Sequence, residues 1–170
     1  RSRLGHHTAG RSVRLGALAA VAYAVGSIQI PRVMQGRYSA EPVTDHFDLE
    51  WGEGKSIRFN AAGSTTVEVT TGPALGVAAA LLDMGKSVVP VLILRRAFPS
   101  THEGVVWATA VAVGQMLPVQ HRFRGGRGEA ILTGTAFALD PASVPVSVAV
   151  SQLVGIYVLR DPLLGAHAWT

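Results

Sequence analysis

Residues 72–94 read GPALGVAAALLDMGKSVVPVLIL, an apolar run whose charged residues are Asp83 and Lys86. A helix needs about 20 mostly apolar residues to cross a bilayer, so this run is long enough to form a transmembrane helix. An ionisable residue inside such a helix is costly and usually has a function. Because Asp83 and Lys86 are three positions apart, they share one helix face and can pair. The pair is either part of a site or a structural ion pair that fixes helix packing.

Further apolar runs indicate more helices in the membrane. Residues 15–30, 104–120 and 141–159 carry no charge. Residues 130–139 are too few to cross alone, since a helix rises about 1.5 Å per residue, and they predict a half-span or an interfacial helix. We therefore predict an all-α fold, a polytopic membrane helical bundle with four to five hydrophobic helical segments.

The composition supports this class. Charged residues make up 15% of the chain and hydrophobic residues 48%, whereas a soluble domain has roughly 25% charged residues. The absence of cysteine excludes disulfides, thiolate nucleophiles and cysteine metal sites, and we expect neither a metal nor a cofactor. The net charge of +4 favours lipid headgroups or an anionic substrate over nucleic acid.

We expect residues 1–170 to form a single membrane domain. Residues 1–14 are interpreted as a basic tail and residues 37–60 as a polar, acidic loop outside the membrane. If the first three spans all cross, the tail and Arg95 lie on one side of the membrane, and the acidic loop lies on the other with residues 122–128. The basic residues on the two sides are nearly balanced, so they do not decide the orientation.

The most informative polar segment is the basic glycine loop, residues 122–128, which reads RFRGGRG. Glycines let backbone N–H groups converge on one point, and the guanidinium forks of Arg124 and Arg127 match phosphate oxygens. Such a loop can hold a phosphate at the membrane surface, or it can be a charged turn that anchors two helices in the headgroups. A hydroxyl-rich segment, Ser64-Thr65-Thr66 with Thr70-Thr71, precedes the run at 72–94. Its hydroxyls either bind a polyol phosphate or, as we favour, cap the helix that begins near Gly72.

The order of these features resembles the bacterial acyl-phosphate:glycerol-3-phosphate acyltransferase family of membrane enzymes. The segment AYAVGSI at 22–28 is similar to the family's A-Y-x-x-G-S-I, and LLDMGK at 81–86 is similar to L-L-D-x-x-K. Residues 114–131 resemble G-H-x-F-P-x-F-x-x-F-K-G-G-K-G-x-A-T, and residues 160–165 resemble R-Y-x-S-L-G.

The resemblance implies an enzyme of phospholipid biosynthesis in the bacterial inner (plasma) membrane. Such an enzyme transfers an acyl group from acyl-phosphate to glycerol 3-phosphate, with membrane lipids as its surroundings and without a metal or cofactor. Its implied catalytic residues are Lys86 and Asp83. Its implied phosphate-binding residues are Arg124, Gly125, Gly126, Arg127 and Gly128, together with Ser64 and Thr65.

The chain also departs from the family's pattern. The family's G-S-G-N-x-G-A-T-N falls on residues 58–66, where only Gly63 and Thr65 agree, and the family histidine is Gln115 here. The family's last segments have no counterpart before Thr170. These departures favour an alternative, a catalytically inactive relative that serves as a lipid-binding or structural subunit of a membrane protein complex.

Overall fold

The computed structural model describes residues 3–44, 46–51, 55–59, 63–99, 102–153 and 157. Most of these residues are helical, as the apolar runs predict. The elements follow along the chain as α1 (Arg3–Ser27), α2 (Ile30–Tyr38), β1 (Phe47–Trp51), β2 (Lys55–Phe59), α3 (Ser64–Thr71), α4 (Pro73–Ala97), α5 (Glu103–Met116), the 3₁₀ turn η1 (Val119–His121), α6 (Glu129–Leu139) and α7 (Ser143–Leu153).

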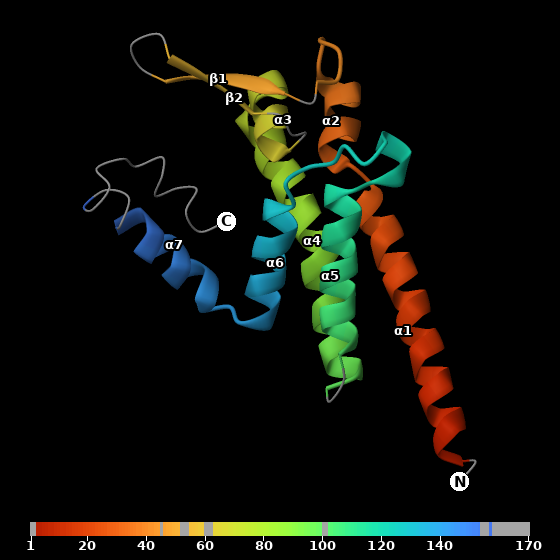
Figure 1. The fold of residues 1–170 in the computed structure, drawn as a ribbon. Helices are drawn as coiled ribbons and strands as arrows, with labels where there is room; N and C mark the ends of the chain where they lie inside the picture. The colour runs from red at the N-terminus through yellow and green to blue at the C-terminus, as the bar shows by residue number, and fades with distance from the viewer. Residues whose placement is uncertain are drawn as a thin grey trace.

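Four helices form the body of the molecule (Figure 1). Helix α1 packs along α5, while α4 packs against both α5 and α6. The core between them is made of side chains from all four helices, among them Ala22, Val91, Val111 and Ile131, which are fully buried. Helix α7 follows α6 and contacts it at the edge of the bundle.

The two ends of the bundle differ. The start of α1, the end of α4 and the start of α5 lie at one end, and α2, α3, the strand pair and η1 lie at the other (Figure 1). The acidic segment and the basic glycine loop therefore share an end, as expected if the first three apolar segments all cross.

Glycine allows α1 and α5 to approach closely. A Cβ atom on Gly26 would lie 2.1 Å from the Val111 carbonyl oxygen, and one on Gly114 would lie 2.2 Å from the Tyr23 carbonyl oxygen. Both neighbours are backbone atoms that cannot move aside. Small residues at a helix contact are typical of helices that pack in lipid.

Two segments are long and apolar enough to cross a membrane, Gly10–Tyr38 and Pro73–Ala97, and Glu129–Leu139 is a shorter apolar helix. Helix α5 is shorter than the predicted run 104–120 because it ends before Pro118, and the residue before a proline is pushed out of helical geometry. The predicted span 141–159 is described only in part, as α7, since residues 154–156, 158 and 159 lie outside the described residues.

The first apolar run is not one continuous helix. Helix α1 ends at Ser27 and α2 begins at Ile30, with Pro31 in its first turn. Proline suits a first helical turn, where no intrahelical bond needs its missing N–H. Helix α1 begins at Arg3. Residues 3–14, which we predicted to be a basic tail, therefore form the first part of this helix.

The segment 37–60, which we predicted to be a polar loop, contains an antiparallel strand pair, in which Phe47 faces Phe59 and Trp51 faces Lys55. Asp48 and Arg58 are opposite each other, and Arg58 Nε and Nη2 donate to the two carboxylate oxygens at 2.8 and 3.0 Å. Opposite charges on facing strands stabilise such a pair. The Arg58 hydrogen bond lowers the pKa of the Asp48 carboxyl.

The expected cap of the helix near Gly72 is wrong. Gly72 itself precedes α4 and makes no side-chain cap. The hydroxyls of Thr70 and Thr71 donate backward to the carbonyl oxygens of Thr66 and Val67 at 2.8 and 2.6 Å. Threonine often bonds to the preceding turn of its own helix in this way, and both residues belong to a separate short helix, α3.

Candidate functional site

The two charged residues of α4 form a buried pair with a third partner from α5. Lys86 Nζ lies 2.8 Å from Asp83 Oδ1, and the two side chains are 9% and 4% exposed. Gln115 connects both charges, since its Nε2 donates to Asp83 Oδ2 at 3.1 Å and its Oε1 accepts from Lys86 Nζ at 2.9 Å. An amide fits this position because it has a donor and an acceptor on one rigid group.

Lys86 has three polar contacts inside the protein. Besides the ion pair with Asp83 and the hydrogen bond to Gln115, its Nζ donates to the Ile28 carbonyl oxygen at 2.7 Å. Lys86 therefore joins α4 to the end of α1 and to α5.

The break between α1 and α2 supplies the next layer of polar contacts. Gln29 is buried in this break, and its Nε2 donates to the Gln115 carbonyl oxygen at 3.0 Å. Gln120 Nε2 donates to the Ser27 carbonyl oxygen. The Ser27 carbonyl oxygen at the end of α1 is thus bonded to a side chain that lies just before the basic glycine loop.

The segment that leads into this loop, together with the loop's first residues, is held in a tight turn. Tyr23 Oη donates to the Leu117 carbonyl oxygen at 2.7 Å and accepts from the Val119 N–H at 3.2 Å. Arg122 and Phe123 both adopt left-handed backbone geometry, with φ of 54° and 61°. This conformation is uncommon for residues other than glycine, and the turn returns the chain toward the end of α5.

Gly125 lies where the loop passes closest to α5. A Cβ atom there would be 2.0 Å from the Gln115 carbonyl oxygen and 2.7 Å from the Met116 carbonyl oxygen. The next residue, Gly126, donates its N–H to the Gln115 carbonyl oxygen at 3.1 Å. Gln115 therefore bonds to the ion pair through its side chain and to the loop through its backbone.

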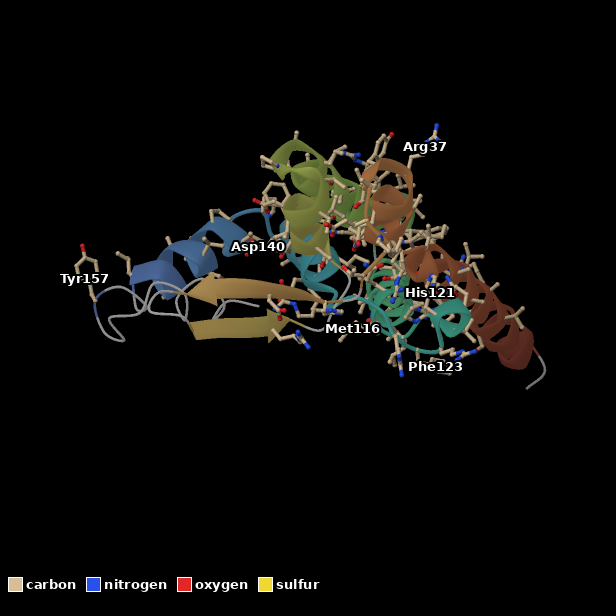
Figure 2. The ribbon with its side chains drawn as sticks, turned by 90° about the horizontal axis from the view of Figure 1, so that it is seen from above. Arg37, Met116, His121, Phe123, Asp140 and Tyr157 are labelled. Carbon is tan, nitrogen blue, oxygen red and sulfur yellow. The ribbon has the colours of Figure 1, made fainter. Side chains whose placement is uncertain are left out.

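The loop's arginine side chains lie on the surface. Arg124 is exposed, and its carbonyl oxygen accepts a hydrogen bond from Arg32 Nη2 at 2.9 Å. Arg127 Nη1 lies 3.0 Å from Glu129 Oε1. Viewed from this end in Figure 2, His121 and Phe123 lie on the side of α1, away from the strand pair.

The loop ends where α6 begins. Gly128 precedes the helix with a φ of 79°, a conformation that favours glycine. The first N–H groups of a helix have no partner within it and attract anions. The first N–H groups of α6 lie next to the exposed Arg127. The end of the loop therefore combines an arginine side chain with the amide groups of a helix N-terminus.

Ser64 and Thr65 are located in the first turn of α3, at the same end of the molecule as the loop. Thr65 is exposed and Ser64 is partly buried. The structure thus joins Asp83, Lys86 and the loop through hydrogen bonds, while Ser64 and Thr65 share only that end with them.

Sequence reasoning did not identify Gln29, Gln115 and Tyr23 as parts of this network. The signal for Gln29 was available, because a polar side chain within an apolar run needs a buried partner. Within the described residues, no group of three or more metal-binding side chains comes together.

Comparison with known proteins places the chain in one family. Residues 16–166 match the glycerol-3-phosphate acyltransferase family. A protein of that name from Anaeromyxobacter sp. (strain K) is 38% identical over 91 residues, which cover 51% of this chain and 45% of the relative. Another from Pseudomonas syringae pv. syringae (strain B728a) is 28% identical over 150 residues, which cover 88% of this chain and 71% of the relative. The chain spans about half the length of the first relatives it matches. No solved structure matches it.

Proposed function

Because the chain belongs to the glycerol-3-phosphate acyltransferase family, we propose that it is a multi-pass membrane enzyme that transfers a fatty acyl group from an acyl-phosphate to glycerol 3-phosphate. The observation that carries the proposal is that one residue, Gln115, connects the basic glycine loop to the buried ion pair. Its carbonyl oxygen accepts a hydrogen bond from the Gly126 N–H, and its side chain bonds to Asp83 and Lys86.

The reaction suits a site built from anion-binding groups. A hydroxyl oxygen of glycerol 3-phosphate attacks the acyl carbonyl carbon, the bond from that carbon to the phosphate oxygen breaks, and phosphate leaves with the hydroxyl proton. Because the acyl group is already activated, the protein mainly has to hold two phosphates together and stabilise developing charge. Arg124, Arg127 and the glycine N–H groups of the loop supply donors for these phosphates.

In this proposal Asp83 and Lys86 are positioning residues. Lys86 Nζ is held by two hydrogen bonds and by the ion pair with Asp83, so direct contact with substrate would displace one of these contacts. Their role is to fix Gln115, and through it the end of α5 and the loop. Positioning of this kind matters because small displacements of binding groups reduce rates strongly.

Glu129 is expected to tune the affinity for phosphate. It competes with a bound phosphate for Arg127, whose Nη1 is 3.0 Å away. Replacing Glu129 by glutamine keeps the shape and removes the competing charge. We therefore expect a lower KM for one of the two phosphate substrates in Glu129→Gln.

The placement in the membrane rests on α1 and α4. Segments Gly10–Tyr38 and Pro73–Ala97 are each long and apolar enough to cross, and α5 and α6 pack beside α4 in the same bundle. We propose that all four lie in the bacterial inner membrane, with the loop at one surface. Ser64 and Thr65 are proposed as further hydroxyl donors to a phosphate at that surface.

The test is a direct assay on the purified chain in detergent. Acyl-phosphate and labelled glycerol 3-phosphate are supplied, and labelled lysophosphatidic acid is measured. We expect product from the wild type, a loss of at least about tenfold in Arg124→Ala/Arg127→Ala, since each charged hydrogen bond contributes about 1.5–3 kcal/mol, and little change in Arg96→Ala, whose exposed arginine lies at the other end. Equal product from the wild type and the double variant would refute the proposal.

A further inference from the structure

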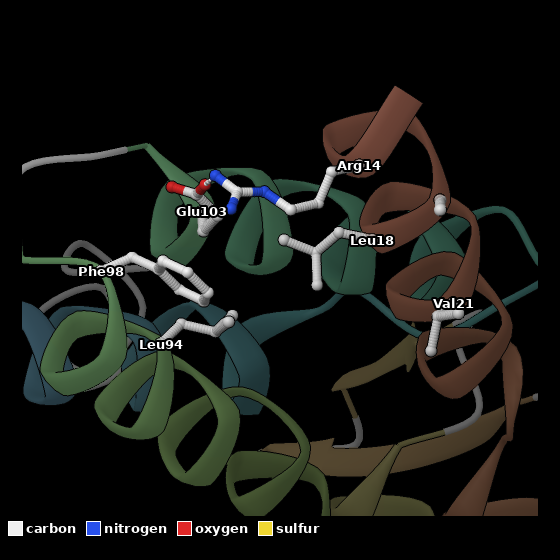
Figure 3. A pocket seen from close by; sticks show the side chains of 7 residues that line it. Arg14, Leu18, Val21, Leu94, Phe98 and Glu103 are labelled. Carbon is white, nitrogen blue, oxygen red and sulfur yellow. Dashed lines mark hydrogen bonds and ion pairs between the residues drawn. The ribbon is translucent and has the colours of Figure 1, made fainter. Parts of the chain in front are cut away.

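A groove lies between α1 and the corner where α4 meets α5, at the end of the bundle opposite the basic glycine loop. Its volume is about 240 Å³. Most of the side chains that line it are apolar, with Arg14 and Glu103 as the exceptions (Figure 3). The lining residues are Arg14, Ala17, Leu18, Val21, Leu94, Phe98 and Glu103.

The polar end of the groove is a fixed structure. Arg14 pairs with Glu103, which is 1% exposed, and its guanidinium carbon lies 4.8 Å from the centre of the Phe98 ring. The Arg14 side chain is nevertheless 48% exposed, so the pair with Glu103 leaves much of it accessible. Burial of Glu103 makes the pair a permanent part of the wall, and an arginine held in this way is pre-organised for an anion.

The groove continues a stripe along α1. Arg11, Arg14, Leu18 and Val21 are spaced three, four and three residues apart, which places them on one face of the helix. They span about 15 Å along the helix axis. The stripe is basic toward the N-terminus and apolar toward the middle of the bundle, and Arg11 is exposed.

This polarity matches the layers of a membrane. The apolar run of α1 begins directly after Arg14, and α4 reaches the same end with Arg95 and Arg96 in its last turn. Arginines at this level lie among headgroups, whereas the apolar part of the groove lies at the level of acyl chains.

We infer that this groove binds an anionic phospholipid, with one acyl chain between α1 and α4 and the phosphate at Arg11 and the exposed face of Arg14. Arg14 and Glu103 compensate each other's charge, so Arg11 supplies the net positive charge of the stripe on α1. Basic pockets between membrane helices bind anionic headgroups in this way. The inference rests on the membrane placement of α1 and α4, but it is independent of acyl transfer and lies away from the basic glycine loop.

The experiment compares two lipids with identical acyl chains, phosphatidylglycerol and phosphatidylcholine, by native mass spectrometry of the purified chain. We expect one phosphatidylglycerol to be retained at concentrations where phosphatidylcholine is not. Arg11→Gln should reduce this preference about fivefold, because one basic residue at a lipid surface contributes about that factor. Arg37→Gln changes an exposed arginine of α2, which lies at the other end of the bundle (Figure 1), and should leave the preference unchanged. Arg37 is also labelled in Figure 2.

A second pair of variants tests the apolar part. Val21→Phe fills the groove and should abolish retention of the lipid, whereas Val13→Phe adds the same side chain at a position that is 73% exposed and not part of the groove. Free glycerol phosphate, which has the headgroup chemistry without chains, should not displace the lipid. Equal retention of both lipids, or retention unchanged in Val21→Phe, would overturn the inference. Because binding is measured without turnover, a failed acyl-transfer assay leaves this result standing.

Discussion

Replacing Lys86 by methionine should strongly destabilise the protein, because it leaves the Asp83 carboxylate buried without its cation. The Asp83 side chain is 4% exposed, and its Oδ1 lies 2.8 Å from Lys86 Nζ. Removing one partner of a buried pair reduces stability by about 3–5 kcal/mol. The same variant also leaves the Ile28 carbonyl oxygen without its donor, which places the expected loss in the upper part of that range.

Removing both charges should be less harmful than the two single losses together. Apolar residues of similar volume often replace a buried ion pair at little net change in stability. In Asp83→Leu/Lys86→Met the remaining penalty comes from Gln115 and from the Ile28 carbonyl oxygen, which loses its donor. The Gln115 Nε2 loses its acceptor, and its Oε1 keeps only the Gln29 Nε2 donor at 3.4 Å. An unsatisfied buried amide destabilises by about 1–3 kcal/mol, so the double variant should fall in that range.

The measurement is reversible unfolding in mixed micelles of a mild detergent and dodecyl sulfate, followed by helical circular dichroism. The cycle contains the wild type, Lys86→Met, Asp83→Leu and the double variant. Arg96→Met is the control, because it makes a similar change at an exposed position of the same helix. A loss below about 1 kcal/mol in Lys86→Met, where a buried pair predicts about 3–5 kcal/mol, would refute the reasoning. So would a double variant as unstable as the sum of the singles.

Three further predictions concern the loop and the strand pair. Gly125→Ala should lower both stability and acyl transfer, since its Cβ would meet the Gln115 carbonyl oxygen at 2.0 Å. Overpacking of this kind destabilises by about 1–3 kcal/mol. The control in the same unfolding assay is Gly16→Ala, because nothing lies within 4 Å of a Cβ at that position. Tyr23→Phe removes two hydrogen bonds to the start of the loop and should speed amide hydrogen exchange at Val119 without unfolding α1, and unchanged exchange there would contradict the proposed contact. The pKa of Asp48 should rise toward its ordinary value in Arg58→Gln, because the Arg58 hydrogen bond is the main cause of its lowering. Carboxyl NMR titration would measure this pKa. In the wild type, the Asp48–Arg58 ion pair stabilises the strand pair fully above the ordinary carboxyl pKa, and this stabilisation is lost as the pH falls through the lowered pKa.

The helices could be predicted because their signals are local. The apolar run at 72–94 corresponds closely to α4, Pro73–Ala97, since an unbroken apolar segment of this length has few alternatives to a helix. The i, i+3 pairing of Asp83 and Lys86 is equally local, and the structure contains it. Helix ends were harder to predict: Pro118 shortens α5, and the break after Ser27 divides the first apolar run.

The strand pair was missed because charge received more weight than periodicity. Phe47, Leu49 and Trp51 alternate with Asp48 and Glu50, which is the two-residue period of a strand with one polar face. The five acids of this segment suggested a solvated loop instead. In the fold, Asp48 pairs with Arg58 across the strands, so the acid at that position supports the strand pair.

The polar network of the site depended on contacts that no local pattern contains. Gln29 meets Gln115 across 86 positions and Lys86 meets Ile28 across 58, and such pairs become neighbours only once α1, α4 and α5 have packed. This packing in turn depends on Gly26 and Gly114, where any side chain would collide with the facing helix. The sequence therefore indicated the charged pair and the glycine loop separately, and helix packing makes them one connected unit. Any variant that separates α1 from α5 should accordingly disturb the loop even when Asp83, Lys86 and the loop's own residues are unchanged.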